Sequence, residues 1–441
     1  MRPRSCSVPT LIAARTATLT VAVSLLGPQA GLAQSVVPPD TVSTVELSVA
    51  VDGFGNLGGV TVDALGFVYL ANFRDGVWRI SPDGEAKRLT DALYGSSGNA
   101  VDAQGVLYQS NFNGNSVARV GRDGRVEPFV EEGLEGPVGL TFGGDGALYV
   151  CNCRGNSISR VTPEGFVEEF AKDPLLNCPN GITTDESGTL YVVNFNSPDV
   201  VRITPDGTVD RFAQVVGAGG NGHITFTRGS FYITQFRGHA IWRVSRDGEG
   251  VARVAGDGTR EILDGTADRA RFSYPNGIAA APGGKILWIN DLDGETGSAQ
   301  RTGIRLRRVR LVTLSDVLMA AVEGADDPVA ETERAYAAYR AARPDDETLT
   351  DAIQTGYQLL TLRQIGAGVA LFEQNAKDHP GVPAAHYNLG EAYRISGRSD
   401  EAAEAYRAVL RLDPDHAQAL DRLALLERGA SGRGSPEAMS R

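Results

Sequence analysis

Short apolar stretches recur through the first two thirds of the chain at intervals of about 40 residues. Each contains an aromatic residue between apolar neighbours and ends near a polar side chain, as in VYLANF (68–73), LYQSNF (107–112), LYVCNC (148–153), LYVVNF (190–195), FYITQF (231–236) and LWINDL (287–292). A second stretch follows each of the first five and carries an arginine at a matching position: Arg79, Arg119, Arg160, Arg202 and Arg243. These second stretches end in turns such as Pro-Asp-Gly, which favour tight hairpins. The pattern predicts antiparallel strands in a sequence repeat.

A unit of about 40 residues with four short strands is the size of one β-propeller blade. Six units therefore predict a mainly β fold, a six-bladed propeller over residues 34–314. The sixth unit supplies only three clear strands, so we expect VELSVAV (45–51) to complete it. The extra length between the fifth and sixth units predicts an excursion loop around residues 256–270.

After residue 314 the pattern changes, because apolar residues now recur three and four positions apart among alanine, leucine and glutamate. This spacing indicates amphipathic helices. Three pairs of residues lie 34 positions apart, which is a helical-repeat period: Gly356 and Gly390, Phe372 and Tyr406, Pro380 and Pro414. We expect a linker at 315–328, a small α-helical repeat domain at 329–428 and a disordered tail at 429–441.

The amino terminus has the features of a targeting segment. Arg2, Arg4 and Arg15 precede an apolar run from Ala17 to Leu26, and a small residue, Ala33, occupies the expected cleavage position. The run is shorter than the roughly 20 residues needed to span a bilayer. The sequence predicts a signal peptide over 1–33, no membrane span, and a periplasmic or secreted bacterial protein.

Removal of residues 1–33 leaves three cysteines, Cys151, Cys153 and Cys178. An odd number outside the cytoplasm suggests one disulfide and one thiol. Cys153 ends a strand of the third blade and Cys178 precedes the fourth, so a bond between them is geometrically reasonable, with Cys151 as the alternative partner. The net charge of −12 and the dispersed basic residues argue against nucleic acid as a partner.

Two stretches resemble known repeat families. Residues 251–291, VARVAGDGTREILDGTADRARFSYPNGIAAAPGGKILWIND, resemble the NHL repeat, and the other blades share its core. The propeller is more loosely similar to the senescence-marker-protein/gluconolactonase family, and residues 384–420 resemble a tetratricopeptide repeat. The gluconolactonase resemblance implies asparagine and acidic ligands around an axial divalent ion. It also implies a glutamate from the first blade, where Gly58 stands.

Two positions in each blade are expected to face the propeller axis. The first precedes the inner strand and reads Gly58, Ser97, Val138, Asn180, Asn221 and Asn276. The second follows the aromatic residue and reads Asn72, Asn111, Asn152, Asn194, Gln235 and Asp291. We interpret the second set as ligand-binding, and Asn180, Asn221, Asn276 and Asp291 as possible ligands for one divalent cation such as calcium. The alternative is that these residues cap strand ends.

Two histidines of the propeller, His223 and His239, are too few for the three-ligand site of a catalytic zinc. His223 follows Asn221 closely, which makes it a candidate general base, with a structural role as the alternative. Two functions remain open. One is an exported ligand-binding or scaffold protein, with a small polar ligand or peptide at the axis and a protein partner on the helical repeats. The other is a metal-dependent lactonase, hydrolase or lyase.

Overall fold

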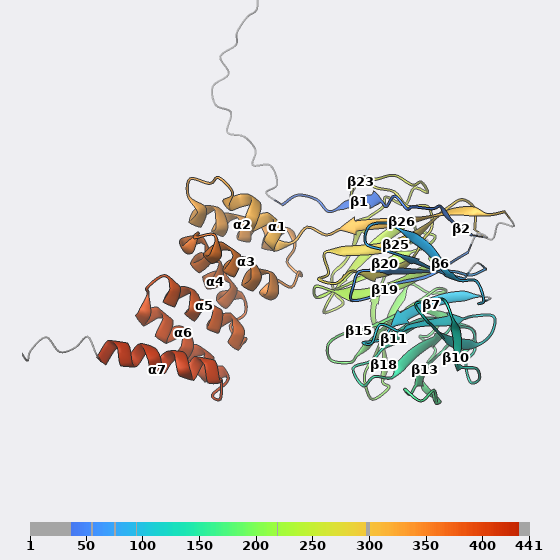
Figure 1. The fold of residues 1–441 in the computed structure, drawn as a ribbon, viewed down its shortest axis with the longest axis horizontal. Helices are drawn as coiled ribbons and strands as arrows, with labels where there is room; N and C mark the ends of the chain where they lie inside the picture. Colours follow the sequence, from blue (N-terminus) through green and yellow to red (C-terminus); the bar gives the residue numbers. More distant parts are fainter. Residues whose placement is uncertain are drawn as a thin grey trace, which may run out of the picture. The chain divides into compact units, whose positions relative to one another are not determined.

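The structure is a computed structural model that describes residues 37–53, 56–74, 76–93, 95–217, 219–296 and 300–431 (Figure 1). The expected signal peptide at 1–33 lies outside the described residues, as do residues 432–441 of the expected tail.

Five antiparallel four-stranded sheets form blades one to five, each from consecutive strands. Blade one contains β3 (Leu57–Val62), β4 (Val68–Asn72), β5 (Gly76–Ile80) and β6 (Ala86–Thr90). Blade two contains β7 (Ser96–Val101), β8 (Leu107–Asn111), β9 (Ser116–Val120) and β10 (Val126–Val130). Blade three contains β11 (Pro137–Phe142), β12 (Leu148–Asn152), β13 (Ser157–Val161) and β14 (Val167–Lys172).

Blades four and five repeat this order. Blade four contains β15 (Pro179–Thr184), β16 (Leu190–Asn194), β17 (Asp199–Ile203) and β18 (Val209–Gln214). Blade five contains β19 (Asn221–Thr227), β20 (Ser230–Gln235), β21 (Ala240–Ser245) and β22 (Val251–Ala255).

Blade six is closed by the amino-terminal segment, as expected. Its own strands are β24 (Pro275–Ala280), β25 (Ile286–Asp293) and β26 (Thr302–Arg310). Two strands from before blade one pair with β26, namely β1 (Thr41–Thr44) and β2 (Val51–Gly53). The expected excursion loop adds β23 (Gly265–Thr266) beyond β1. The six-bladed propeller predicted from the repeats is confirmed.

The closing strand differs from the expected stretch 45–51, because β1 and β2 flank most of it. The intervening residues contact blade one instead: the Ser48 backbone N–H donates to the Gly84 carbonyl (2.9 Å), and the Ser48 hydroxyl accepts from the Ala86 N–H (2.9 Å). The segment therefore joins blade six to blade one as well as completing the sixth sheet.

A ring of glycines sets the spacing of the inner strands β3, β7, β11, β15, β19 and β24, which lie side by side around the axis. A Cβ on Gly98 would lie 2.2 Å from the Val138 carbonyl oxygen, and one on Gly277 would lie 2.5 Å from the Val60 nitrogen. A side chain cannot fit at these distances, so both positions require glycine. The strand register gives the equivalent residues as Gly59, Gly98, Gly139, Gly181 and Gly277, and His223 occupies this position in blade five.

The helical region contains α1 (Leu314–Val322), α2 (Pro328–Ala342), α3 (Leu349–Thr361), α4 (Ile365–Asp378), α5 (Pro383–Ile395), α6 (Ser399–Leu412) and α7 (Ala417–Ser431). Helix α1 lies in the expected linker 315–328. It forms because Thr313 and Asp316 make a reciprocal capping box and Leu314, Leu318 and Val322 are buried. Within the described ranges, no helix is long and apolar enough to cross a bilayer.

Ion pairs connect the helical region to blade five. Arg228, in the turn after β19, makes two hydrogen bonds to the Asp351 carboxylate of α3 (3.1 and 2.7 Å). Arg243 of β21 pairs with Asp346 at 2.6 Å, and the Tyr339 hydroxyl donates to the same carboxylate. These pairs are largely buried, so the first helices are packed against the propeller.

Candidate functional site

A cavity of about 430 Å³ opens at the end of the propeller where the inner strands begin. We call it the mouth. Its wall combines the starts of inner strands with the turns that follow the second strands. The lining includes Phe73, Phe112, Phe195, Phe236, the Cys153 and Cys178 pair, Ser97, Val138, Asn180, Asn276 and Arg237.

Four phenylalanines give the mouth an apolar wall. Each directly follows the polar residue that ends a second strand, in blades one, two, four and five. Neighbouring rings are in contact distance, with centroids 5.5 Å apart for Phe73 and Phe112 and 6.0 Å for Phe195 and Phe236. These residues were not predicted from the sequence as part of a site. The indication was the phenylalanine that ends the repeated stretch, as in VYLANF (68–73).

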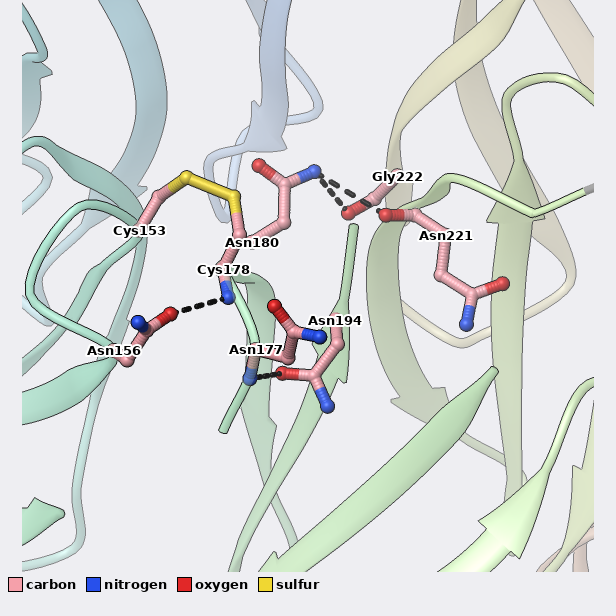
Figure 2. The surroundings of a disulfide bond; sticks show 8 residues. All are labelled: Cys153, Asn156, Asn177, Cys178, Asn180, Asn194, Asn221 and Gly222. Carbon is pink, nitrogen blue, oxygen red and sulfur yellow. Dashed lines mark hydrogen bonds between the residues drawn. A yellow bond between two sulfur atoms is a disulfide. The ribbon is translucent and has the colours of Figure 1, made fainter. Parts of the chain in front are cut away.

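In blade three the equivalent position is a cysteine, and it forms a disulfide. Cys153 bonds Cys178, which joins the turn after β12 to the loop before β15 (Figure 2). The predicted pair is confirmed. Cys178 has a positive φ of 51°, and its N–H donates to the Asn156 side-chain oxygen at 2.8 Å. Cys151 is the buried free thiol, and burial raises its pKa, so it is an unreactive core residue.

Asn180 and Asn276 are the expected axial amides that line the mouth. The Asn180 Nδ2 donates to the carbonyl of Gly222 (2.7 Å), and the Asn276 Nδ2 donates to that of Gly58 (2.9 Å). Each amide nitrogen therefore binds the inner strand of the next blade, as Figure 2 shows for Asn180. With the nitrogens engaged, the amide oxygens are the atoms that can accept hydrogen bonds from a ligand.

Asn221 is not among the mouth-lining residues. It is almost fully buried, its Nδ2 donates to the Ser197 carbonyl (3.3 Å), and its amide lies apart from that of Asn180 (Figure 2). Its Oδ1 has no hydrogen-bond partner among the described residues. Gly58 contributes no side chain, so the first set does not form a continuous amide ring.

The second expected set is engaged with backbone and neighbouring side chains. The Asn152 Oδ1 accepts from the Glu135 N–H (3.1 Å), and the Asn194 Oδ1 accepts from the Asn177 N–H (3.0 Å). Asn72, Asn111 and Gln235 likewise bond nearby backbone groups, among them the Asp52 carbonyl of β2 for Asn72 and the Val215 carbonyl after β18 for Gln235. These contacts are those of loop caps, and they shape the mouth from behind.

Asp291 belongs to the same set but is fully buried in blade six. Its carboxylate pairs with the equally buried Arg307 (3.0 Å) and accepts from the N–H groups of Ser273 (3.0 Å) and Tyr274 (2.7 Å). Burial raises the pKa of Asp291 to about 6, against the opposing attraction of Arg307. Asp291 is therefore bonded within blade six and does not line the mouth with Asn180 and Asn276.

His223 lies on the axis rather than in the lining of the mouth. A Cβ on Gly59 would lie 3.3 Å from the His223 Cε1, so the imidazole reaches from blade five to blade one. Burial lowers the pKa of His223 to about 4, which keeps the ring neutral at physiological pH. A neutral imidazole can accept a proton, but this one is only 8% exposed.

The donors at the mouth do not fit a divalent cation. The side-chain oxygens are the amide oxygens of Asn56, Asn180 and Asn276 and the hydroxyls of Ser97 and Thr296, with no carboxylate in the described lining. No group of three or more histidine, cysteine, aspartate or glutamate side chains suited to a metal occurs in the described part of the chain. Calcium sites normally include carboxylates, so the residues that line the mouth do not suit a calcium ion.

Comparisons with known proteins identify the family of the propeller. Residues 59–289 match the model of the virginiamycin B lyase family. The chain belongs to this family. Residues 353–429 match a tetratricopeptide repeat model, as predicted. The NHL resemblance of blade six remains an expectation, and no curated protein matches the chain.

Similar solved structures share the propeller. A protein of unknown function from Bacteroides thetaiotaomicron is 19% identical, with a TM-score of 0.51, over 62% of this chain and 76% of that one. An inactive virginiamycin B lyase variant from Staphylococcus aureus with quinupristin is 21% identical, with a TM-score of 0.44, over 58% and 81%. A Xanthomonas campestris gluconolactonase is 19% identical, with a TM-score of 0.46, over 62% and 95%. At these identities the likeness concerns the fold alone.

Proposed function

We propose that this protein is an exported binding protein whose mouth holds a short peptide or peptide-like ligand. The observation that carries the proposal is the composition of the mouth. Phenylalanine rings suit apolar side chains, the amide oxygens of Asn180 and Asn276 suit peptide N–H groups, and Arg237 suits a carboxylate.

Binding is favoured over catalysis because the mouth lacks acid–base groups. No carboxylate or imidazole is in its described lining, and its two cysteines are joined in a disulfide. A lyase or hydrolase needs a base within hydrogen-bond reach of the proton that it removes. Asn180 and Asn276 cannot take that role, since amides do not titrate in the relevant pH range.

The helical repeats supply a second binding surface in this proposal. Tetratricopeptide repeats support a role in contacting another protein. A cavity of about 820 Å³ lies between α6 and α7 and is lined by Arg398, Glu401, Arg407 and Leu425. Its mixed charged and apolar lining suits a protein segment of similar character.

Export is supported by two independent features of the chain. Residues 1–33 have the pattern of a signal peptide. The Cys153–Cys178 disulfide is of the kind that persists in the periplasm or outside the cell. We therefore place the binding activity in the periplasm or the medium.

Family membership favours one second candidate, a lyase with His223 as its base. The neutral imidazole lies on the axis, and a ligand that reached past the mouth would approach it. Catalysis would then need a deeper ligand position than the lining of the mouth supplies. The following experiment separates the two functions.

We suggest calorimetric titration of the chain from Gln34 onward with short aromatic peptides and with quinupristin as a cyclic probe. Binding that weakens in Phe195→Ala and Arg237→Gln, with Arg125→Gln in the exposed turn before β10 as control, supports the mouth. Chromatography of the incubated ligand then tests catalysis. An intact ligand supports a binding protein, and conversion that is lost in His223→Gln supports a lyase. Unchanged binding in both mouth variants contradicts the proposal.

A further inference from the structure

A second cavity, of about 500 Å³, lies between blades two and three. Its wall includes the turns after the inner strands of both blades and the turn after β13. None of its lining residues belongs to the mouth. We call it the interblade cavity.

The interblade cavity contains Arg119, one of the five arginines that mark the propeller repeat. In blades three, four and five this arginine is neutralised by a carboxylate. Arg160 pairs with Asp145 (2.8 Å), Arg202 with Asp210 (3.0 Å) and Arg243 with Asp346 (2.6 Å). In blade one the Arg79 guanidinium instead lies over Phe67, 3.7 Å from the ring centroid.

Arg119 has no ion pair among the residues that the structure describes. Its Nε donates to the Tyr108 hydroxyl (3.0 Å), and one Nη2 N–H points to the Pro163 carbonyl (3.4 Å). A guanidinium has five N–H donors, so three remain for a ligand. Glu127 lies opposite Arg119 in the sheet but pairs with Arg125 instead (3.2 Å).

Aromatic rings form the apolar part of the interblade cavity. The Tyr108 ring meets Phe129 and Phe142 edge to face, with centroids 5.0 and 5.1 Å away. The Arg119 Cζ lies over the Phe129 ring, 4.3 Å from its centre, so the guanidinium is in contact with the aromatic wall. A Cβ added to Gly144 would meet nothing within 4 Å, so this side of the cavity is open.

We infer that the interblade cavity binds small aromatic carboxylates. A planar guanidinium with free donors binds a carboxylate through paired hydrogen bonds. The phenylalanines beside it would contact the aromatic ring of the same molecule. The ligand carboxylate would take the place of the side-chain carboxylates that pair with Arg160, Arg202 and Arg243.

The test uses 4-fluorobenzoate as the probe and fluorine NMR to measure its binding to the folded, unlabelled chain. We expect the probe to bind Arg119→Gln at least about tenfold more weakly, because the variant loses one charge-assisted pair. Arg202→Gln is the matched control, because it removes an arginine of the same repeat position that is already paired. The uncharged 4-fluorobenzamide should bind much more weakly than the carboxylate.

Arg119→Lys separates charge from geometry, since lysine keeps the charge without the planar fork, and we expect an intermediate affinity. Circular dichroism checks that each variant is folded. Three results would overturn the inference: equal binding of the amide and the carboxylate, undiminished binding to Arg119→Gln, or loss of binding in the mouth variant Arg237→Gln alone. The mouth and the interblade cavity share no residue, so failure here leaves the proposed function untouched.

Discussion

The propeller and the helical repeats both keep glycine at fixed positions, but for different reasons. In the propeller, glycine allows two backbones to approach, and a Cβ on Gly181 would lie 2.5 Å from the His223 Cα. In the helical repeats, glycine receives an aromatic ring from the next helix. A Cβ on Gly356 would lie 2.4 Å from the Phe372 ring, and one on Gly390 would lie 2.6 Å from the Tyr406 ring.

The difference shows which residues of a repeat protein carry structure and which carry chemistry. Residues that recur in most repeats, such as the inner-strand glycines, are needed for packing. The distinctive sites are departures from the repeat. Cys153 stands where four blades have phenylalanine, and His223 stands where the other five blades have glycine. Arg119 lacks the carboxylate partner that Arg160, Arg202 and Arg243 have.

The largest expected effect comes from Gly181→Val, because backbone atoms cannot move aside without opening the ring. We expect a loss of folding or a destabilisation above about 4 kcal/mol, seen as a lowered urea midpoint. Gly390→Ala should cost less, about 1–3 kcal/mol, because the Tyr406 ring can shift. Gly144→Ala is the matched control, with open space at its Cβ. Equal destabilisation by Gly181→Val and Gly390→Ala would contradict the distinction between glycines that contact backbone and glycines that contact a ring.

The buried pair in blade six gives the next effect. Asp291→Ala removes the buried carboxylate partner of the fully buried Arg307 and leaves it only the partly exposed Asp264, and we expect a loss of about 3 kcal/mol in the free energy of unfolding. The double variant Asp291→Leu with Arg307→Met removes both charges and should recover part of that loss. Denaturant titration of both variants measures this coupling. A double variant less stable than the single one would show that the other bonds of Arg307 matter more.

Loss of the disulfide should have a smaller effect. Cys153→Ser opens a loop closed over a sequence separation of 25 residues, which predicts about 2–4 kcal/mol of destabilisation. Cys153→Phe with Cys178→Ser introduces the residue that four other blades have at this position, so it should be more stable than Cys153→Ser with Cys178→Ser. Thermal unfolding of these variants, with Cys151→Ser as a control for the buried thiol, measures the order. The reverse order would show that blade three has no room for the ring.

The sequence predicted the fold because the repeat signal is additive: six aromatic positions and five arginines indicate the same unit. It predicted the site less completely. Asn152 and Asn194 lie at the ends of their strands and Asn180 near the start of β15. Only the fold shows that the first two bond loops while the third lines the mouth. The four phenylalanines of the mouth were not predicted, because only polar residues were considered as site candidates and aromatic residues in a repeat suggest core packing.

The smallest and most selective effect concerns His223. Its pKa is lowered from 6.5 to about 4 by burial, so the unfolded chain binds more protons between these values and stability falls as the pH drops through that window. Between pH 7.5 and pH 5 we expect this histidine to lower the free energy of unfolding by about 2 kcal/mol. Asp291 contributes a pH dependence of the opposite sign. Its pKa in the folded protein is raised to about 6, so the free energy of unfolding falls as the pH rises above 3.8.

The two titrations overlap, so the wild-type profile alone does not isolate either group. We therefore expect the difference between wild type and His223→Gln, measured by urea unfolding from pH 4.5 to 7.5, to contain the histidine effect alone. His239, which is also in blade five but is half-buried with its Nδ1 at the Ser273 carbonyl, supplies the control variant His239→Gln. If the free energy of unfolding of the wild type varied with pH in parallel with that of His223→Gln, the axial imidazole would be hydrated. His223 would then again be a candidate for an accessible base.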